Sequence, residues 1–386
     1  MRILFVHEVN YLEKPVFEMH EFPELLASHG HTVTFMDYAE SPKVFPRTLQ
    51  TMDRMINGRV ISDAFLRLVT QPQLAPGVIG RIIAAVLFPL SYMKVVKRFR
   101  PEIIVCYGVP TNGWQTVLIS KFFQIPVIYR AIDSSTDIRP SKLKTLIAVA
   151  EQVVCRYATL VVANNLILSK HCQKLGATRA IVIAPGFSHY GHYSPRNVAP
   201  EADYVFMGTL FPFCGLVELV ESIAARQDTR HLQFLIVGDG PDRRRLEAKI
   251  AELGLQEQFT FTGYTPFESV FNAISRARMG IVPFLRCRAA DLALPAKVFQ
   301  YLLAERPVVS TPLEGLTSTV PPGCGVIFAA PGQPFVDELL QLAEDSKRCQ
   351  EASLAAVRLL NEKFNWTTQI RAFEDALAHA QIAHKQ

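Results

Sequence analysis

The segment from 289 to 306, which reads AADLALPAKVFQYLLAER, contains residues suited to binding an anion. Pro295 fits the first turn of a helix, because the N–H group that it lacks would have no partner there. Lys297 and Gln300 are three residues apart and therefore share one helical face. The free N–H groups of a helix start and a lysine attract phosphate, and Gln300 can hold a phosphate oxygen or a hydroxyl. We therefore expect a phosphate-binding site here; the alternative is an ordinary capped surface helix.

A second candidate is Asp133, which follows the apolar run Val127–Arg130. Since this run predicts a strand, Asp133 falls at the carboxyl end of that strand, where α/β proteins bind their ligands. A carboxylate in this place can accept a proton from a hydroxyl group as that group attacks another atom. The alternative is that Asp133 caps the next helix, together with Ser134 and Ser135. We expect the catalytic role, as a general base.

Further charged residues lie near these two segments. Arg286 and Arg288 precede the lysine helix, and guanidinium groups fit a phosphate or a uronate carboxylate, although surface arginines are often only solvated. Glu8 follows the first predicted strand and is a candidate for binding hydroxyl groups of a substrate. His189 and Glu314 are further candidates for residues that line a substrate-binding cleft.

The chain lacks the usual patterns of a metal or cofactor site. No Asp-x-Asp pair occurs, and the cysteines and histidines do not have the spacing of a zinc site. We therefore expect no metal and no cofactor, with a helix dipole and cations stabilising a diphosphate instead. The glycine-rich segment VGDGP at 237–241 lacks both GxGxxG spacing and a P-loop lysine, so it predicts a tight turn.

Short apolar strands alternate with helical stretches along most of the chain, which is typical of parallel α/β layers. A length of 386 residues exceeds one average core. We therefore predict an α/β fold of two Rossmann-like, doubly wound parallel-sheet domains that face a cleft. The predicted strands are Arg2–His7, His31–Met36, Ile103–Tyr107, Val127–Arg130, Leu160–Ala163, Ala180–Ala184, Tyr204–Met207, Gln233–Val237, Phe259–Thr262, Met279–Pro283, Pro307–Ser310 and Gly325–Phe328. The clearest predicted helices are Asp242–Leu253, Ser269–Arg278 and Ala296–Ala304.

Composition also predicts the domain boundaries. Pro185–Ala202 is rich in Pro, Gly, His, Tyr and Ser, which indicates an interdomain linker at 186–202. The two domains then cover residues 1–185 and 203–365. We expect residues 366–386 to form a C-terminal helix that packs back on the first domain.

Charge and cysteine content exclude several classes of protein. With 40 basic and 35 acidic residues, the formal net charge of +5 favours anionic ligands but is far from that of a nucleic-acid-binding protein. Seven scattered cysteines, an odd number, indicate reduced thiols. The first residues, MRILFV, predict a strand and not a signal peptide, so we expect a cytoplasmic location.

The segment Val78–Pro101 has the composition of a membrane contact. Its apolar part, Ile82–Met93, is too short to cross a bilayer. It predicts either peripheral contact with the anionic cytoplasmic face of the inner membrane or a buried helix, and periodicity does not separate the two. The basic residues that follow the apolar part are Lys94, Lys97, Arg98 and Arg100.

Several motifs resemble those of bacterial family 4 glycosyltransferases and their GT-B relatives. The segments VGDGPDRRRLEAKI, FTFTGYTPFESVFNAISRARMGIVPF and LPAKVFQYLLAERPVVSTPLEGL occur in the order of that family. HEFPELLASHGHTVTF is similar to its first helix and second strand. The resemblance implies a hexosyltransferase that binds a nucleotide-diphosphate sugar in the domain at 203–365 and an acceptor in the domain at 1–185.

A narrower set of motifs, IPVIYRAIDSST, GTLF, ARMGIVPF and K-x-x-Q, is similar to the xanthan glucuronosyltransferases, which are inverting GT-B enzymes. This resemblance implies that Asp133 is the catalytic base, with Tyr129 and Arg130 at the acceptor cleft. It also implies a UDP-sugar donor, with glucuronic acid as one candidate, and a lipid-linked oligosaccharide or similar acceptor in bacterial polysaccharide synthesis. The implied donor-binding residues are Lys297, Gln300, Thr209, Leu210, Tyr264, Phe284 and Ala296.

The chain also departs from the family 4 pattern. It has Thr209 and Cys214 where that family usually carries Arg and Lys, and Ile132 where it usually carries His. These departures leave three alternatives open: a retaining family 4 transferase with another donor, a nucleotide-sugar epimerase, and a non-catalytic protein that binds sugar nucleotides. The complete Tyr-Arg-x-x-Asp and K-x-x-Q segments favour transfer.

Overall fold

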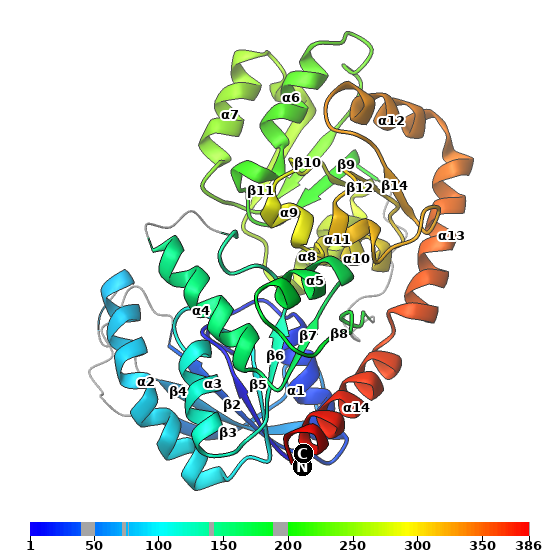
Figure 1. Ribbon diagram of the computed structural model, residues 1–386. Coiled ribbons are helices and arrows are strands. Elements are labelled where there is room, and N and C mark those ends of the chain that lie inside the picture. Colours follow the sequence, from blue (N-terminus) through cyan, green and yellow to red (C-terminus); the bar gives the residue numbers. More distant parts are fainter. Residues whose placement is uncertain (40–50, 72–74, 76, 139–142, 188–199, 386) are drawn as a thin grey trace. The chain divides into compact units, whose positions relative to one another are not determined.

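A computed structural model describes residues 1–39, 51–71, 75, 77–138, 143–187 and 200–385. The chain forms two compact units. The first unit comprises Met1–Gly186 together with Thr367–Gln386, and the second comprises Phe187–Trp366. Each unit has its own sheet, as Figure 1 shows. Most of the predicted linker, including His189, lies outside the described residues.

The first unit is built on an eight-stranded sheet with the order β3-β4-β2-β1-β5-β6-β7-β8. Neighbouring strands are parallel except for the edge pair of β3 and β4. The central strands are continuous apolar runs, because a parallel sheet is buried on both faces. The strands are β1 Arg2–Val6, β2 Thr32–Tyr38, β3 Met52–Asn57, β4 Phe65–Gln71, β5 Ile103–Cys106, β6 Val127–Ala131, β7 Leu160–Ala163 and β8 Ala180–Val182.

The sequence patterns do not predict the antiparallel pair of β3 and β4. Nearly all side chains of β3 are exposed, so this edge strand has no apolar run by which it could be recognised. The turn after β3 is held by Glu24, whose carboxylate accepts hydrogen bonds from the N–H groups of Arg59, Val60 and Ile61. A glutamate far away in the sequence therefore fixes this edge of the sheet.

Helices α2, α3 and α4 lie side by side over one face of the first sheet (Figure 1). The C-terminal helix α14 belongs to this unit from Thr367 onward, and its Phe373 packs against Phe22 of α1 with ring centroids 4.4 Å apart. Glu374 of α14 lies 2.9 Å from the Nδ1 atom of His29. The helices are α1 Glu18–Ser28, α2 Gly77–Phe99, α3 Gly113–Phe122, α4 Lys144–Tyr157, α5 Leu166–Lys174 and α14 Trp366–Lys385.

The second unit contains a six-stranded, wholly parallel sheet with the order β11-β10-β9-β12-β13-β14. The strand order reverses between β9 and β12, so the loops after these two strands diverge and leave room for a ligand. The strands are β9 Ala202–Met207, β10 Phe234–Val237, β11 Phe259–Gly263, β12 Ala277–Val282, β13 Val308–Ser310 and β14 Val326–Phe328. The helices are α6 Leu216–Ala224, α7 Arg243–Glu252, α8 Phe267–Ser275, α9 Arg288–Leu292, α10 Ala296–Leu303, α11 Glu314–Thr317, α12 Gln333–Glu344 and α13 Ser346–Lys363, with short 3-10 turns at Pro212–Cys214 and Gln256–Gln258.

The predicted fold class, two α/β units with largely parallel sheets, is confirmed. All predicted strands are present, and their ends differ from the predicted ends by at most two residues. The helix predicted at Ser269–Arg278 occurs earlier, as α8, because Ala277 already pairs with Ala202 in the sheet. Pro295 is the residue before α10, not its first residue.

Candidate functional site

In the second unit, the candidate site lies at the carboxyl ends of β9 and β12, where the strand order reverses. Gly208 follows β9 with φ of +130°, a conformation open to glycine and strained for other residues. A Cβ atom on Gly238, at the end of β10, would lie 2.1 Å from the carbonyl oxygen of Gly208. These two glycines let neighbouring strand ends approach closely. The VGDGP segment is therefore a tight turn, as its sequence predicts.

Lys297 of α10 points at this strand end. Its Nζ atom lies 3.9 Å from the ring centroid of Phe206 and 4.8 Å from that of Phe284, which gives two cation–π contacts. A Cβ atom on Gly208 would come within 3.2 Å of Nζ, so glycine leaves room for the ammonium group. In the part of the chain that the structure describes, no carboxylate pairs with Lys297. Burial lowers the pKa of this lysine to about 8.

Tyr301 anchors the helix that carries Lys297, and the sequence patterns give no sign of this. Its hydroxyl accepts a hydrogen bond of 2.7 Å from the N–H group of Met207, the last residue of β9. Its ring packs on Gly280 of β12, where a Cβ atom would lie only 2.3 Å from a ring carbon. Tyr301 thus connects α10 to both strands of the site and positions Lys297 between them.

The other predicted donor-binding residues differ in exposure. Gln300 is half-buried one turn after Lys297, and Ala296 is exposed at the first position of α10. Leu210 and Phe284 are buried, and the rings of Phe284 and Phe213 pack nearly perpendicular to each other, with centroids 5.4 Å apart. Thr209 and Tyr264 are exposed.

Cys214, which stands where family 4 enzymes usually carry a basic residue, is buried. Its thiol donates a weak hydrogen bond of 3.5 Å to the carbonyl oxygen of Thr209. Burial raises the pKa of this thiol, so it remains neutral. Lys297 therefore supplies the positive charge next to this loop.

The two predicted loop arginines are in different situations. The Nε atom of Arg286 lies 2.8 Å from Asp291, and its Nη2 atom lies 3.1 Å from Glu314. Arg286 is therefore already paired with two carboxylates. Arg288 is exposed at the start of α9. Glu314 thus contacts the loop arginine, and Arg286 braces the loop ahead of α10.

In the first unit, Asp133 lies two residues after the end of β6 and is half-buried. Its carboxylate has no hydrogen-bond or ion-pair partner among the described residues. Burial raises its pKa to about 7, and the negative charge of Glu18 adds to the effect. A carboxylate with a pKa near neutrality is suited to accept and release protons.

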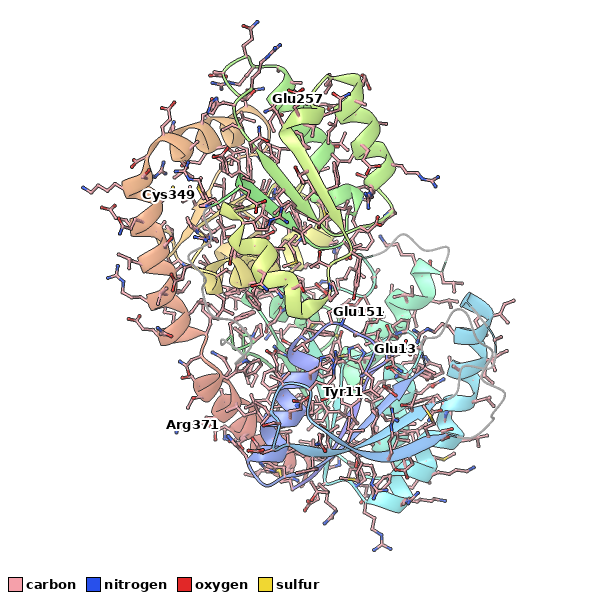
Figure 2. All side chains as sticks on the ribbon, turned by 180° about the vertical axis from the view of Figure 1, so that it is seen from behind. Tyr11, Glu13, Glu151, Glu257, Cys349 and Arg371 are labelled. Carbon is pink, nitrogen blue, oxygen red and sulfur yellow. The ribbon has the colours of Figure 1, made fainter. Side chains whose placement is uncertain are left out.

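The turn after β6 is held by carboxylates other than Asp133. Ser134 donates a hydrogen bond of 3.0 Å to Asp137. Glu151 of α4, which is labelled in Figure 2, accepts from the N–H groups of Ser135 and Thr136. Asp137 and Glu151 therefore perform the local structural task that the alternative interpretation gives to Asp133. The carboxylate of Asp133 remains available for another role.

Tyr129 and Arg130, the two residues predicted at the acceptor cleft, are instead buried in the core of the first unit. Arg130 forms a bidentate ion pair with Glu18 of α1, with N–O distances of 2.7 and 2.6 Å. Its third contact is a hydrogen bond of 2.6 Å to the carbonyl oxygen of Ile183. With its side chain 0% exposed, Arg130 braces the end of β6 from inside the core.

Glu8 lies at the strand-order reversal of the first sheet, beside β1 and β5. Its carboxylate accepts a hydrogen bond from the hydroxyl of Thr111, and its carbonyl oxygen accepts one from Arg81. The preceding residue, His7, stacks on Tyr107 at 5.2 Å, and burial lowers its pKa to about 3. His7 is therefore neutral, and Glu8 is the acidic side chain at this strand end.

The part of the chain that the structure describes contains no cluster of three or more His, Cys, Asp or Glu side chains that could hold a metal ion. All seven cysteines are free.

Residues 201–345, within the second unit, match the family model of glycosyl transferases group 1. The 2-deoxystreptamine glucosyltransferase of Streptomyces kanamyceticus is 32% identical over 144 residues, which are 37% of this chain and 35% of that enzyme. The alpha-D-kanosaminyltransferase of the same organism is 29% identical over 138 residues, 35% of this chain and 34% of the relative. The alignments thus span about a third of each relative's length.

Solved structures resemble the whole chain. A sucrose-phosphate synthase from Thermosynechococcus elongatus superposes with a TM-score of 0.81 over 99% of both chains, at 15% identity. The Anabaena protein HepE in complex with UDP superposes with a TM-score of 0.72 over 98% of this chain and 100% of that one, at 16% identity. At such identities the likeness shows the fold, which is the predicted GT-B fold.

Proposed function

We propose that this protein is a glycosyltransferase that moves a sugar from a UDP-sugar to a hydroxyl group of an acceptor. The proposal depends mainly on the environment of Lys297 at the start of α10. This lysine is half-buried and has no carboxylate partner among the described residues. It lies within the segment that matches glycosyl transferases group 1. A diphosphate would supply the missing negative charge and would also meet the free N–H groups of the helix start.

We assign the second unit to donor binding, with Lys297 at the diphosphate and Gln300 at a ribose hydroxyl or phosphate oxygen. The first unit would bind the acceptor, with Asp133 as the general base. In the reaction, the acceptor oxygen bonds to the anomeric carbon while the bond from that carbon to the diphosphate breaks. Asp133 takes the proton of the acceptor, and the departing diphosphate keeps the electron pair. Lys297 stabilises the charge that develops on the leaving group.

We propose that this transfer inverts the anomeric centre and needs no metal or other cofactor. A single displacement aided by a base inverts the carbon that it attacks, and the chain has no Asp-x-Asp pair. Activity should therefore survive an excess of chelator. An absolute requirement for magnesium or manganese would contradict this part of the proposal.

For the substrates, we propose glucuronic acid as the donor sugar and a lipid-linked oligosaccharide as the acceptor, in bacterial polysaccharide synthesis. The support is the similarity of Tyr-Arg-x-x-Asp and K-x-x-Q to the xanthan glucuronosyltransferases. Such an acceptor would place the enzyme at the cytoplasmic face of the inner membrane, with Val78–Pro101 contributing to the contact.

A second candidate is a transferase with a glucose or amino-sugar donor, which could retain the anomeric configuration. The similarity to 2-deoxystreptamine glucosyltransferase and to alpha-D-kanosaminyltransferase favours it. The two candidates differ in donor and in product stereochemistry. A protein that binds sugar nucleotides without catalysis would bind UDP but form no product.

The test is to incubate the protein with UDP-glucuronic acid, UDP-glucose or UDP-N-acetylglucosamine and a panel of lipid-linked and soluble saccharide acceptors. UDP release identifies the donor, and nuclear magnetic resonance of the product shows its anomeric configuration. An inverted glucuronosyl product supports the first candidate, and a retained glucosyl product supports the second. UDP binding without product from any pair would contradict the proposed activity.

A further inference from the structure

Helix α2 has an apolar stripe that faces solvent. Ile79, Ile82, Val86 and Leu90 recur at intervals of three or four residues, which places them along one side of the helix. All four are exposed, and Val86 is the most exposed at 69%. From the sequence we expect an apolar part, Ile82–Met93, that is too short to cross a bilayer, but the whole helix from Ile79 to Phe99 is long and apolar enough to do so. Only 33% of its most apolar window is buried. It is therefore not an ordinary core helix.

The opposite side of α2 is built into the first unit. Phe88, Tyr92 and Val96 are buried, and the hydroxyl of Tyr92 lies 2.6 Å from that of Ser120 in α3. Pulling α2 into a bilayer as a spanning helix would break these contacts. Only the exposed stripe is free to meet an apolar environment.

Helices α3 and α4 extend this apolar surface. Trp114, Leu118 and Phe122 of α3 are exposed, and Phe122 reaches 83%. Leu146 and Val149 of α4 are exposed as well. Since α3 contacts both α2 and α4, the three helices form one layer, which Figure 1 shows over one face of the first sheet. We call the exposed side of this layer the α2–α4 surface.

The charges of this layer are almost all of one sign. Helices α2, α3 and α4 contain one acidic residue, Glu151, and it is buried. The exposed stripe of α2 continues beyond Leu90 directly into Lys94 and Lys97. The basic residues of the three helices are Arg81, Lys94, Lys97, Arg98, Lys121, Lys144 and Arg156.

The exposed apolar stripe and the excess of basic residues together indicate which kind of partner could cover the α2–α4 surface. A second copy of the chain would bring like charges together, which opposes association. An anionic bilayer offers an apolar interior for the stripe and phosphate groups for the lysines beside it. A helix with such a stripe and a basic end typically lies in the plane of the interface.

We propose that the α2–α4 surface docks on an anionic lipid bilayer. The apolar stripe of α2 enters the boundary between headgroups and acyl chains, and Lys94 and Lys97 contact the headgroups. The inference deepens the proposed function by naming the surface that would bring the enzyme to a lipid-linked acceptor, and it rests on that function for its purpose. The docking itself is measurable without any transfer reaction.

The experiment is sedimentation of the full chain with vesicles of phosphatidylcholine and phosphatidylglycerol, and with vesicles of phosphatidylcholine alone. The wild type should bind the anionic vesicles, and added salt should weaken binding. Lys94→Glu with Lys97→Glu should reduce the partition coefficient by about 25-fold or more, since each lysine near an anionic surface contributes about fivefold. Ile82→Ser with Val86→Ser should reduce it by about tenfold, because less apolar area leaves water.

Matched controls come from α13 of the second unit, where Lys347 and Leu354 are also exposed. Lys347→Glu and Leu354→Ser should leave vesicle binding unchanged. Thermal melting of each variant shows whether it is folded. Tryptophan fluorescence gives an independent readout, because Trp114 is exposed and Trp366 is buried. Anionic vesicles should shift the emission to the blue, and Trp114→Phe should abolish the shift.

Several outcomes would overturn the proposal. These are a wild type that does not sediment with anionic vesicles, equal binding to neutral vesicles, normal binding by the α2 variants, or dimerisation that the α2 variants abolish. Transfer to a soluble acceptor is measured in parallel. Variants that lose vesicle binding but keep this turnover support docking, whereas vesicle binding with no turnover on any substrate contradicts only the proposed activity.

Discussion

The end of β6 in the first unit carries two ionisable side chains in opposite situations. Arg130 is completely buried, and the carboxylate of Glu18 matches its charge through two short hydrogen bonds. Asp133, three residues later, is half-buried and has no partner among the described residues. Burial shifts the pKa of Asp133 up to about 7.

The loop before α10 and the helix itself repeat this contrast in the second unit. Arg286 is paired with Asp291 and Glu314. Lys297 lies over two aromatic rings and has no carboxylate partner in the part of the chain that the structure describes. Burial shifts its pKa down to about 8. In both units, therefore, an arginine paired with carboxylates lies close in sequence to an ionisable group at a strand end that has no partner of opposite charge among the described residues.

The comparison distinguishes charged residues that stabilise the fold from ionisable residues that are suited to binding or catalysis. A buried pair stabilises its own surroundings only while both members are present. An unmatched ionisable group costs the folded protein some stability, and such groups gather where a ligand or a reaction uses them. Asp133 and Lys297 fit the second description. Arg130 fits the first, and Arg286 is also paired, but at the surface.

The largest expected effect belongs to Asp133. Asp133→Asn keeps the size of the side chain but cannot take a proton, so turnover should fall by about 10²–10⁴-fold. Donor affinity should barely change, because the base acts on the acceptor. Turnover and UDP affinity are measured by UDP release and calorimetry.

A nearby carboxylate provides the control for Asp133. Asp137→Asn removes a charge four residues away, where the side chain accepts from Ser134, and it should keep most of the activity. If Asp133→Asn retains near-normal turnover, or if the product keeps its anomeric configuration, Asp133 is not the base of an inverting transfer.

Removing one member of the buried ion pair between Arg130 and Glu18 should lower the stability of the protein. Glu18→Gln leaves the buried guanidinium of Arg130 without a countercharge, and the free energy of unfolding should fall by about 3–5 kcal/mol. Asp133→Asn should cause no comparable loss. Chemical denaturation measures both.

The double variant sharpens this test. Replacing both members, as in Glu18→Gln with Arg130→Met, should cost less than Arg130→Met alone, because no charge is then left unpaired. Strictly additive costs would show that the two side chains do not act as a pair.

Lys297 is expected to have an intermediate effect on binding. Lys297→Ala should weaken UDP binding by about 1.5–3 kcal/mol, the range of a charge-assisted contact. The control is Lys249→Ala in α7, a lysine paired with Glu221 and Glu252. Calorimetry with UDP alone is the measurement, and unchanged affinity in the Lys297 variant would remove this lysine from the donor site.

The smallest effect is expected in the pH profile. The base form of Asp133 is lost as the pH falls below about 7, and the charged form of Lys297 is lost as it rises above about 8. The value of kcat/KM should therefore peak between these values. The Asn variant at Asp133 should lose the acidic limb and keep the alkaline limb. An unchanged acidic limb in that variant would assign it to another group.

Much of the fold and part of the site depend on local sequence. Most buried parallel strands are recognised because they are continuous apolar runs. The exposed edge strand β3 has no such signal, and the sequence patterns do not predict its partner β4 either. The spacing of Lys297 and Gln300 is local to one helix, so their common face follows from the sequence. The position of Asp133 after a strand follows in the same way.

Only the tertiary structure decides which of these charges are matched. Arg130 and Asp133 look equally suited to a cleft from the motif that contains them, but Glu18 comes from a helix 112 positions earlier and pairs with one of them. Tyr301 likewise reaches β9 across 94 positions to hold α10 in place. Local patterns arise from the geometry of a single helix or strand. Ion pairs and long-range hydrogen bonds depend on which elements the chain topology brings together, and short segments of sequence do not carry that information.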